Sequence, residues 1–367
     1  MRVAISLQEI AEKVGSSRAT VSNILSNRGL PYNSETVRRV REAAAELGFR
    51  ANAAARTLKR GTFGAVTLVM SDHAERSYLP RALLTGICAA LDVRDVHLNI
   101  AMLSDAQLTG EESLPRLLCE WSSDGLLVNY NFTFPEHLEE SLELRRVPAI
   151  WINQKQAVNA VYPDDLAAGR SATEHLLALG HRRIAYLDTY IERARQARWL
   201  HYSKPDRMEG YTQAMAAARL EPLVLTDALE LERDLIARLS APDRPTALLG
   251  YAPVDFDPLF RHQVALGLRV PADLSLMTFG DSTDTRVAGL RATQMLMDQG
   301  AAGRRAAELL LGRIGKPMQV RLPSQATPYS LVEGETVATP AQESGHAVAR
   351  AKESQLAPNG ARKEKAG

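Results

Sequence analysis

A short amphipathic helix is predicted close to the N-terminus. Apolar residues recur over positions 7–14 with the i, i+3, i+4, i+7 spacing of one helix face. Ser6 and Glu9 are spaced as a capping box, in which each side chain satisfies a backbone N–H at the start of the helix. Gly15 follows as a turn residue. The pattern therefore predicts a capped helix that ends at a tight turn.

Two more helices follow with the spacing of a helix-turn-helix. Ser17 can cap a second helix whose apolar side carries Val21, Ile24 and Leu25. A third is predicted from Asn33 to Leu47, with Gly48 as its C-terminal stop. On the second helix this arrangement leaves a polar outer surface near the N-terminal end, formed by Arg18, Ala19, Ser22 and Asn23.

After Gly61 short apolar runs alternate with helix-like stretches. The predicted strands cover 64–70, 96–103, 124–130, 147–153, 183–188, 246–251 and 274–280. The predicted helices cover 78–93, 112–121, 167–180, 206–220 and 256–267. This alternation predicts parallel sheets with right-handed crossovers. Because the elements fall into two similar series, we expect two doubly wound α/β lobes with a crevice between them.

The resulting domain plan is an all-α head, a linker, a two-lobed body and a tail. The head covers 1–50 and the linker 51–62, and the body runs from 63 to 335. Lobe 1 is assigned 63–160 and 290–318, and lobe 2 is assigned 161–288 and 319–335. The tail, 336–367, lacks aromatic residues and shows no apolar heptad, so it is predicted to be disordered.

Charge is distributed unevenly along the chain. The formal net charge is +1, yet residues 1–62 hold eleven Lys or Arg against five Glu, which gives that segment +6 and the remainder −5. A basic module on a near-neutral body is typical of nucleic-acid binding. The two cysteines, Cys88 and Cys119, indicate no disulfide framework. With no signal-peptide pattern and no apolar run of membrane-spanning length, we expect a cytoplasmic protein that does not enter the membrane.

No arrangement typical of catalysis is found in the sequence. The eight histidines show neither HExxH nor Cys–His metal spacing, and there is no GxSxG motif or P-loop. We therefore expect no enzyme activity, no cofactor and no metal site.

Several segments together resemble the lactose-repressor (LacI/GalR) family of bacterial transcription regulators: the head, ANAAARTLKRG (51–61), ALGHRRIAYL (178–187) and RMEGY (207–211). PADLSLMTFGDS (271–282) and GRRAAELLL (303–311) extend the resemblance, which covers about residues 5–333. It implies a periplasmic-binding-protein-like body behind a DNA-binding head.

The resemblance implies specific DNA contacts in the head. Arg18, Ala19 and Asn23 match base-reading positions, and these side chains suit guanine, a thymine methyl and adenine respectively. Contacts to operator phosphates, which fix register without reading sequence, are implied for Ser17, Thr20, Ser22, Asn27, Asn33 and Thr36. In the linker, Leu58 matches a leucine that enters the minor groove between two paired hinge helices, and Lys59 lies beside it.

The resemblance also implies an effector site between the lobes. Arg207 matches an effector-clamping arginine, and Asn153 matches a cleft position that hydrogen-bonds a sugar hydroxyl. Trp151 either stacks on a ligand or packs in the core, and Asp281 and Asp298 are possible further acceptors. Gly280 and Ala252-Pro253 replace two frequent polyol contacts, which leaves open an ordinary sugar, a different ligand or none.

These inferences together predict a homodimeric regulator, more often a repressor than an activator in this family, that binds a palindromic operator. A small-molecule effector, sugar-like in chemistry, would modulate its affinity for DNA. A solute-binding protein with the same two-lobed body is the alternative, against which the basic head argues.

Overall fold

The computed structural model describes most of the chain. The residues that it describes are 5–26, 32–50, 61–73, 76–109, 122–131, 136–196, 200–226, 231–317 and 319–341. The chain divides into two compact units, Met1–Gly64 and Ala65–Gly367. Each unit has apolar cores of its own, and the first is called the head here.

The described part of the head forms three helices. They are α1 (Leu7–Val14), α2 (Arg18–Leu25) and α3 (Ser34–Glu46). The predicted capping box is confirmed, because Ser6 Oγ accepts the backbone N–H of Glu9 and the Glu9 carboxylate accepts the backbone N–H of Ser6 at 2.7 Å. Gly15 ends α1 with a φ of +63°, a conformation that glycine adopts without a steric penalty. Ile10, Val21 and Val40, one from each helix, are fully buried in the head core.

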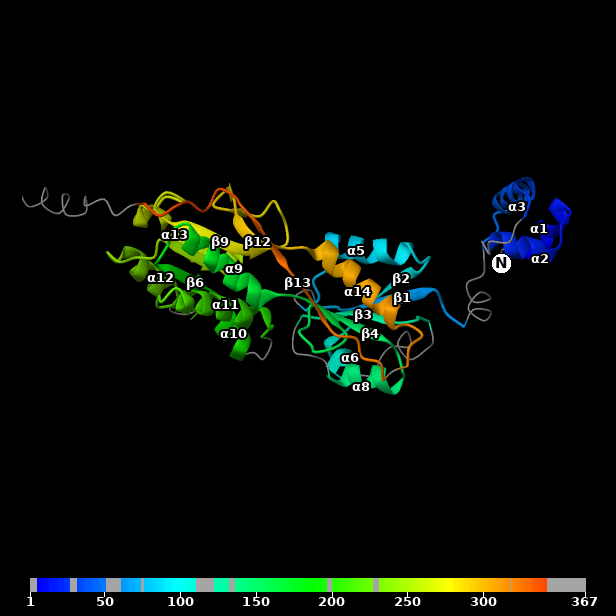
Figure 1. Cartoon of the computed structure of the whole chain (residues 1–367), viewed down its shortest axis with the longest axis horizontal. Coiled ribbons are helices and arrows are strands. Elements are labelled where there is room, and N and C mark those ends of the chain that lie inside the picture. Colours follow the sequence, from blue (N-terminus) through cyan, green and yellow to red (C-terminus); the bar gives the residue numbers. More distant parts are fainter. Residues whose placement is uncertain are drawn as a thin grey trace, which may run out of the picture. The chain divides into compact units, whose positions relative to one another are not determined.

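Lobe 1 is built on a parallel sheet whose described strands have the order β13-β5-β4-β3-β1-β2. Its strands are β1 (Ala65–Ser71), β2 (His97–Leu103), β3 (Leu126–Asn129), β4 (Ala149–Ile152), β5 (Ala160–Pro163) and β13 (Gln325–Thr327). The helices α5 (Arg81–Asp92) and α14 (Gln299–Arg313) cover one face of this sheet, and α6 (Asp105–Thr109) and α8 (Glu136–Leu144) cover the other (Figure 1).

Lobe 2 is built on a second sheet of the same kind, with the described strands in the order β14-β12-β9-β8-β6-β7. Its strands are β6 (Ile184–Leu187), β7 (Leu223–Leu225), β8 (Ala247–Gly250), β9 (Ser275–Gly280), β12 (Thr293–Met297) and β14 (Tyr329–Val332). All pairings are parallel except that of β14 with β12. The predicted pair of doubly wound parallel sheets is therefore confirmed.

Helices cover both faces of the second sheet as well. One face packs against α9 (Asp165–Ala178) and α11 (Ser203–Ala217), and the other against α12 (Leu231–Ser240) and α13 (Asp257–Leu266). The remaining short elements of this lobe are α10 (Ile191–Gln196), η1 (Pro253–Phe256), β10 (Arg286–Val287) and β11 (Leu290–Arg291). Within the described part of the chain, no helix is long and apolar enough to cross a membrane.

The chain passes from one lobe to the other after β5, after β12 and after β13. The predicted lobe boundaries at 290 and 319 are therefore wrong: β12 belongs to lobe 2 and β13 to lobe 1. Both strands are short and adjoin the crossings, where an apolar pattern does not reveal which sheet a strand joins. The third pass, from β13 to β14, spans Pro328 alone, so the two sheets are tied together closely.

The body also extends beyond the predicted boundary at residue 335. Thr336 is fully buried, its hydroxyl donates to the carbonyl oxygen of Leu276 at 2.6 Å, and its own carbonyl accepts the backbone N–H of Leu276 at 2.7 Å. Ala338 donates its backbone N–H to Ser275 Oγ at 3.1 Å. The start of the predicted tail is thus a strap across lobe 2, held by hydrogen bonds that composition does not encode. The rest of the predicted tail, from 342 onward, lies outside the described residues.

Close packing of α9 on α11 predicts that Gly210→Ala will lower the free energy of unfolding by about 1–3 kcal/mol. A Cβ at position 210 would lie 2.2 Å from the carbonyl oxygen of Leu166, so the two helices would have to separate. Gly312→Ala on α14 is the matched control, because no atom lies within 4 Å of a Cβ there, and alanine should stabilise that helix by up to about 1 kcal/mol. Urea denaturation measures both, and equal stability of the two variants would contradict the packing argument.

Candidate functional site

The N-terminal end of α2 forms an exposed surface on the head. Arg18 and Ala19 are exposed, whereas Val21 on the opposite side of the helix is fully buried. Ser17 fixes this end, because its hydroxyl oxygen accepts the backbone N–H of Thr20 at 3.0 Å. Arg18 and Ala19, two of the predicted base-reading residues, therefore lie on the exposed side of α2, whose opposite side packs in the head core through Val21.

Asn23, the third predicted base-reading residue, is half-buried one turn further along α2. Its Nδ2 donates to the hydroxyl oxygen of Tyr32 at 3.1 Å. This contact joins α2 to the residues just before α3 and restrains the orientation of the amide. A base contact through Asn23 would have to use the amide in this orientation or break the bond to Tyr32.

Five of the six predicted phosphate contacts lie on α2 and α3 or at their N-terminal caps. The hydroxyl oxygens of Ser17 and Thr20 are 2.9 Å apart, and Asn33 Oδ1 caps α3 by accepting a backbone N–H at 2.9 Å. Ser22 and Thr36 are half-buried on α2 and α3. All five are short polar side chains with hydroxyl or amide donors, the chemistry that suits phosphate oxygens.

Three of the predicted DNA contacts fall outside the described residues. They are Asn27, Leu58 and Lys59. Residues 51–60, which include nearly all of the predicted linker, are also outside them. Their roles remain predictions from the sequence.

Asn153 joins the two lobes. It follows β4 with a φ of +60°, in the left-handed region that asparagine tolerates better than most residues. Its Nδ2 donates to Asn131 Oδ1 at 3.0 Å within lobe 1. Its carbonyl oxygen lies 2.9 Å from His201 Nε2, and its Oδ1 accepts from the hydroxyl of Tyr202 at 3.4 Å. His201 and Tyr202 belong to lobe 2, directly before α11, so this predicted effector residue is engaged by the protein itself.

Two further contacts bridge the same lobe junction. Lys155 Nζ and Asp206 Oδ2 form an ion pair of 2.5 Å between the segment after β4 and the first turn of α11. Burial raises the pKa of the Tyr78 phenol in lobe 1, and the carboxylate of Asp281 in lobe 2, to which it is hydrogen-bonded, raises it further. Asp281 therefore lies at the junction, and its predicted contact with an effector stays a prediction.

Arg207, the predicted effector clamp, is buried in lobe 2 with 7% of its surface exposed. Its Nε donates to Asp165 Oδ1 at 2.6 Å, one terminal nitrogen donates to the carbonyl oxygen of Tyr251 at 2.9 Å, and the other donates to the hydroxyl of Tyr329 at 2.8 Å. The guanidinium carbon also lies 4.4 Å from the centre of the Phe279 ring, which favours a cation over the aromatic face. Arg207 is thus held rigidly by lobe 2.

A second buried ion pair lies beside Arg207. Lys204 Nζ is 2.6 Å from Asp188 Oδ1, and it also sits 3.8 Å from the centre of the Tyr251 ring. Asp188 Oδ2 and Asp165 Oδ2 are buried without a hydrogen-bond partner among the described residues. Such carboxylate oxygens are costly to leave unpaired in a dry interior. The carboxyl ends of the second sheet therefore combine two cations, two carboxylates and a set of aromatic rings.

The other predicted effector residues have structural roles. Asp298 caps α14 by accepting the backbone N–H of Ala301 at 2.8 Å. A Cβ at Gly280 would lie 2.0 Å from Gln294 Oε1, so a larger residue there would require the Gln294 side chain to move. The Gln294 amide donates to the carbonyl oxygen of Ser282 at 2.7 Å and fills the space beside position 280. An acidic side chain at position 280 would need this space.

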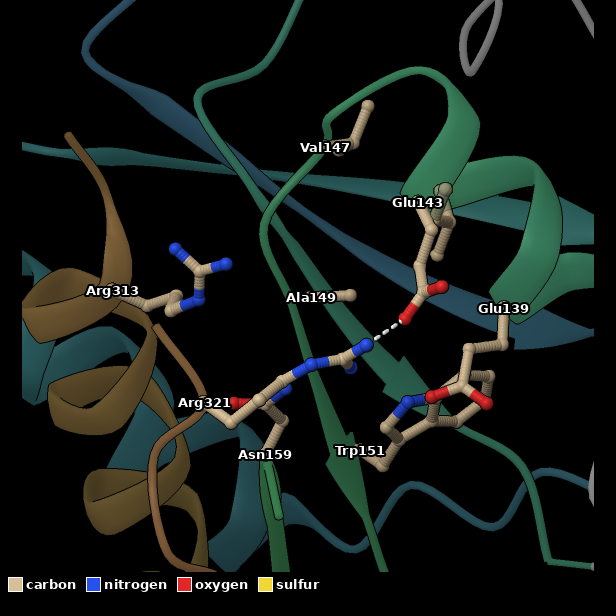
Figure 2. Close-up of a pocket in the computed structure, with 9 residues that line it drawn as sticks. Glu139, Glu143, Val147, Ala149, Trp151, Asn159, Arg313 and Arg321 are labelled. Atoms are coloured by element: carbon tan, nitrogen blue, oxygen red, sulfur yellow. Dashed lines mark hydrogen bonds and ion pairs between the residues drawn. The ribbon is translucent and has the colours of Figure 1, made fainter. Parts of the chain in front are cut away.

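Trp151 faces away from the lobe junction. It is 2% exposed and packs in the core between the first sheet and α8, which decides between the two alternatives in favour of core packing. Figure 2 shows its ring beside a pocket of lobe 1 near α8 and the end of α14, where Arg321 is paired with Glu143. The strand ends at Ile152 and the backbone turns at Asn153, so the two-residue spacing from Trp151 to Asn153 does not place both side chains at the lobe junction.

Sequence reasoning missed several residues that form the junction. They are Asn131, Asp165, His201, Tyr202, Tyr251 and Tyr329. Asp165 starts the helix α9 and Tyr329 starts the strand β14, each directly after a lobe crossing, and β14 is too short to show a hydrophobic period. The Asp164-Asp165 pair before a helix was the available signal, since acidic residues favour a helix N-terminus.

Family models match the chain in the same order as its structural units. One for "Bacterial regulatory proteins, lacI family" matches residues 6–52. One for "Periplasmic binding proteins and sugar binding domain of LacI family" matches 65–252, just over half of the chain, and a periplasmic binding protein-like domain matches 173–337. The chain belongs to the LacI family. It is therefore a member of a family of DNA-binding transcription regulators, and the predicted resemblance is confirmed.

Individual LacI-family proteins resemble the chain over most of its length. The HTH-type transcriptional regulator GntR of Pseudomonas aeruginosa is 26% identical over 314 residues, which cover 84% of this chain and 89% of that protein. A lac repressor dimer bound to operator and the anti-inducer ONPF has a TM-score of 0.70 at 22% identity, covering 92% of this chain and all of that one. A CelR–cellobiose complex has a TM-score of 0.59 at 24% identity, covering 90% and 99%. These two structures support the fold.

Proposed function

We propose that this LacI-family member is a sequence-specific repressor that binds a palindromic operator as a homodimer. The observation that carries the proposal is the exposed, capped N-terminal end of α2, where Arg18 and Ala19 face outward while Val21 anchors the helix. A helix presented in this way fits the major groove. Arg18, Ala19 and Asn23 would read bases, and the phosphate contacts would be those named above. Leu58 and Lys59 would act in the minor groove.

The edge of lobe 1 supports the dimer. The strand β2 lies at the edge of its sheet, where Ile100 and Met102 expose 51% and 55% of their surfaces. Large apolar side chains on an edge strand invite pairing with another chain. The helix α5 packs beside this strand, so a second copy could cover both elements at once. Two heads related by a twofold axis would then meet the two half-sites of a palindrome.

The lobe junction is the proposed effector site. Asn153 and Asp281 belong to different lobes and both lie there, while Arg207 is linked to Asn153 through Asp165 and Tyr202. Such a set of donors and acceptors beside aromatic rings suits a sugar-like molecule. A ligand that prefers one arrangement of the lobes would change operator affinity by the difference between its affinities for the two arrangements. The cellobiose complex of the related regulator is consistent with this ligand class.

Selection of duplexes from a randomised DNA pool tests the proposal. We expect the full-length protein to enrich a palindrome and to bind it as two chains, measured by analytical ultracentrifugation. Affinity should fall by about 10³-fold or more between 50 and 200 mM salt, if six or more phosphates are contacted. The same titration, repeated with mono- and disaccharides, should find a compound that shifts the affinity for the palindrome. Enrichment of no motif would contradict operator binding, and a lack of response to every sugar would contradict the ligand class.

A further inference from the structure

We propose that His201 and Tyr202 are a built-in occupant of the lobe junction, which holds the two lobes together when no ligand is bound and which a ligand has to displace. The two residues belong to lobe 2 and directly precede α11. The competition with a ligand deepens the proposed function and rests on the proposed effector site. The hold on lobe 1 does not rest on that site.

The pair takes up hydrogen-bonding atoms of Asn153 in lobe 1. The carbonyl oxygen of Asn153 can only accept a hydrogen bond, so His201 Nε2, 2.9 Å away, is the donor. The Tyr202 hydroxyl lies 3.4 Å from Asn153 Oδ1 and 3.3 Å from the carbonyl oxygen of Pro163, and its one hydrogen can serve either acceptor. Both oxygens of Asn153 therefore face the pair, and a ligand that binds to them has to take the place of the pair.

The rings of the pair add an apolar contact with lobe 1. Tyr202 meets Tyr162 of β5 edge to face, with 6.0 Å between the ring centres, and the His201 ring lies 4.4 Å from that of Tyr202. A phenol and an imidazole carry O–H or N–H groups at the edge of an apolar ring face. A sugar likewise carries hydroxyl groups around an apolar C–H face. The pair thus offers lobe 1 the kinds of contact that are proposed for a sugar-like ligand.

In lobe 2 the pair is anchored to the start of α11. His201 Nδ1 lies 2.7 Å from Ser203 Oγ, which in turn lies 2.9 Å from the hydroxyl of Tyr251. The carbonyl oxygen of Tyr202 accepts the backbone N–H of Asp206 at 3.1 Å, so Tyr202 is continuous with the helix. Because the pair is fixed to α11, its release from lobe 1 should separate α11 from that lobe.

The size of the effect follows from the number of contacts. A hydrogen bond between neutral groups changes an equilibrium by about 2- to 13-fold, so the loss of two should lower the ratio of joined to separated lobes by about 5- to 150-fold. The contacts of Lys155 with Asp206 and of Tyr78 with Asp281 also bridge the junction and would remain. The apparent affinity for a competing ligand would rise by up to the same factor, because more of the protein would be competent to bind it.

Spin-label distance measurements across the lobes test the hold on lobe 1 without DNA or ligand. Labels at Glu140 on α8 and Gln213 on α11, both exposed, report on the two lobes. Cys88 and Cys119 are replaced by serine, and the labelled chain is diluted with unlabelled chain so that distances within one chain are measured. We expect one narrow distance distribution for the protein with the native pair.

His201→Phe combined with Tyr202→Phe keeps two rings and removes the hydrogen bonds to lobe 1, so its distribution should be longer or broader. Tyr202→Phe alone alters one hydroxyl and should shift the distribution less, in the same direction, which gives a test if the double variant does not fold. Tyr190→Phe is the matched control, because it removes the hydroxyl of a tyrosine of the same lobe that is 42% exposed, and it should leave the distribution unchanged. Circular dichroism verifies folding. A narrow distribution that persists in the double variant would overturn the proposal, as would a broad one with the native pair.

Calorimetric titration tests the competition separately. Glucose, cellobiose and gluconate are titrated into the native protein and into the double variant. We expect a sugar to bind the variant more tightly, by up to about 150-fold. Equal affinity for a bound sugar in both proteins would overturn the competition. If none of the three binds to either protein, the competition fails together with the proposed ligand class, while the distance measurement still decides the hold on lobe 1.

Discussion

Replacing Arg207 by methionine is expected to lower the free energy of unfolding by about 3–5 kcal/mol, because it removes one partner of a buried ion pair. Asp165 is 1% exposed, and Arg207 Nε is its cationic partner at 2.6 Å. The carbonyl oxygen of Tyr251 would lose its donor as well. Methionine fills similar space but supplies no hydrogen bond, so Asp165 would remain buried without a counter-charge. Urea denaturation followed by circular dichroism measures the loss.

Two further variants separate this explanation from a general effect of losing an arginine. Arg170→Met removes an exposed arginine from α9 whose side chain is 59% exposed and paired with Glu174, and such surface pairs contribute about 0–1 kcal/mol. Arg207→Met combined with Asp165→Asn should recover part of the lost stability, because the uncompensated carboxylate is gone. If the double variant is less stable than Arg207→Met alone, the ion pair is not the source of the effect.

Arg18→Ala is expected to cost about 1–3 kcal/mol of discrimination at one base pair of each half-site, and a dimer would lose this amount twice. Arg18 is exposed at the N-terminal end of α2. A guanidinium there can offer two parallel N–H donors to a guanine, which alanine cannot replace. Fluorescence anisotropy with the selected palindrome and with duplexes changed at single base pairs measures the loss.

Arg41→Ala is the control for charge, since Arg41 is also exposed in the head but lies on α3. Both variants lose one positive charge per chain, so both should weaken binding to unrelated DNA to a similar extent. Only Arg18→Ala should reduce the preference for the palindrome over its single-base variants. Equal preference in Arg18→Ala and the native protein would show that Arg18 does not read a base.

The head could be predicted nearly completely from the sequence because its determinants are local. Ser6 and Glu9 are three residues apart, and Ser17 caps a helix that begins at the next residue. Gly15 adopts the left-handed backbone that its place between two helices requires. Each of these interactions spans at most one helical turn, so it is encoded in a few adjacent residues. The long buried strands were predictable for a related reason, since apolar runs such as that of β1 stay buried on both faces.

The lobe junction was decided by the tertiary structure. Asp165 and Tyr329 meet Arg207 across 42 and 122 residues of sequence respectively, and Asn153 meets His201 across 48. Three lobe crossings and the backbone turn at Asn153 decide which of these side chains face one another. Neither feature produces a hydrophobic pattern in the sequence. The sequence determined the DNA-binding head, the family and the two-lobed body through local caps and burial patterns. Only the folded structure shows the partners of Arg207 and the core position of Trp151. It also decides which sheets β12 and β13 join. All three depend on contacts between residues far apart in the sequence.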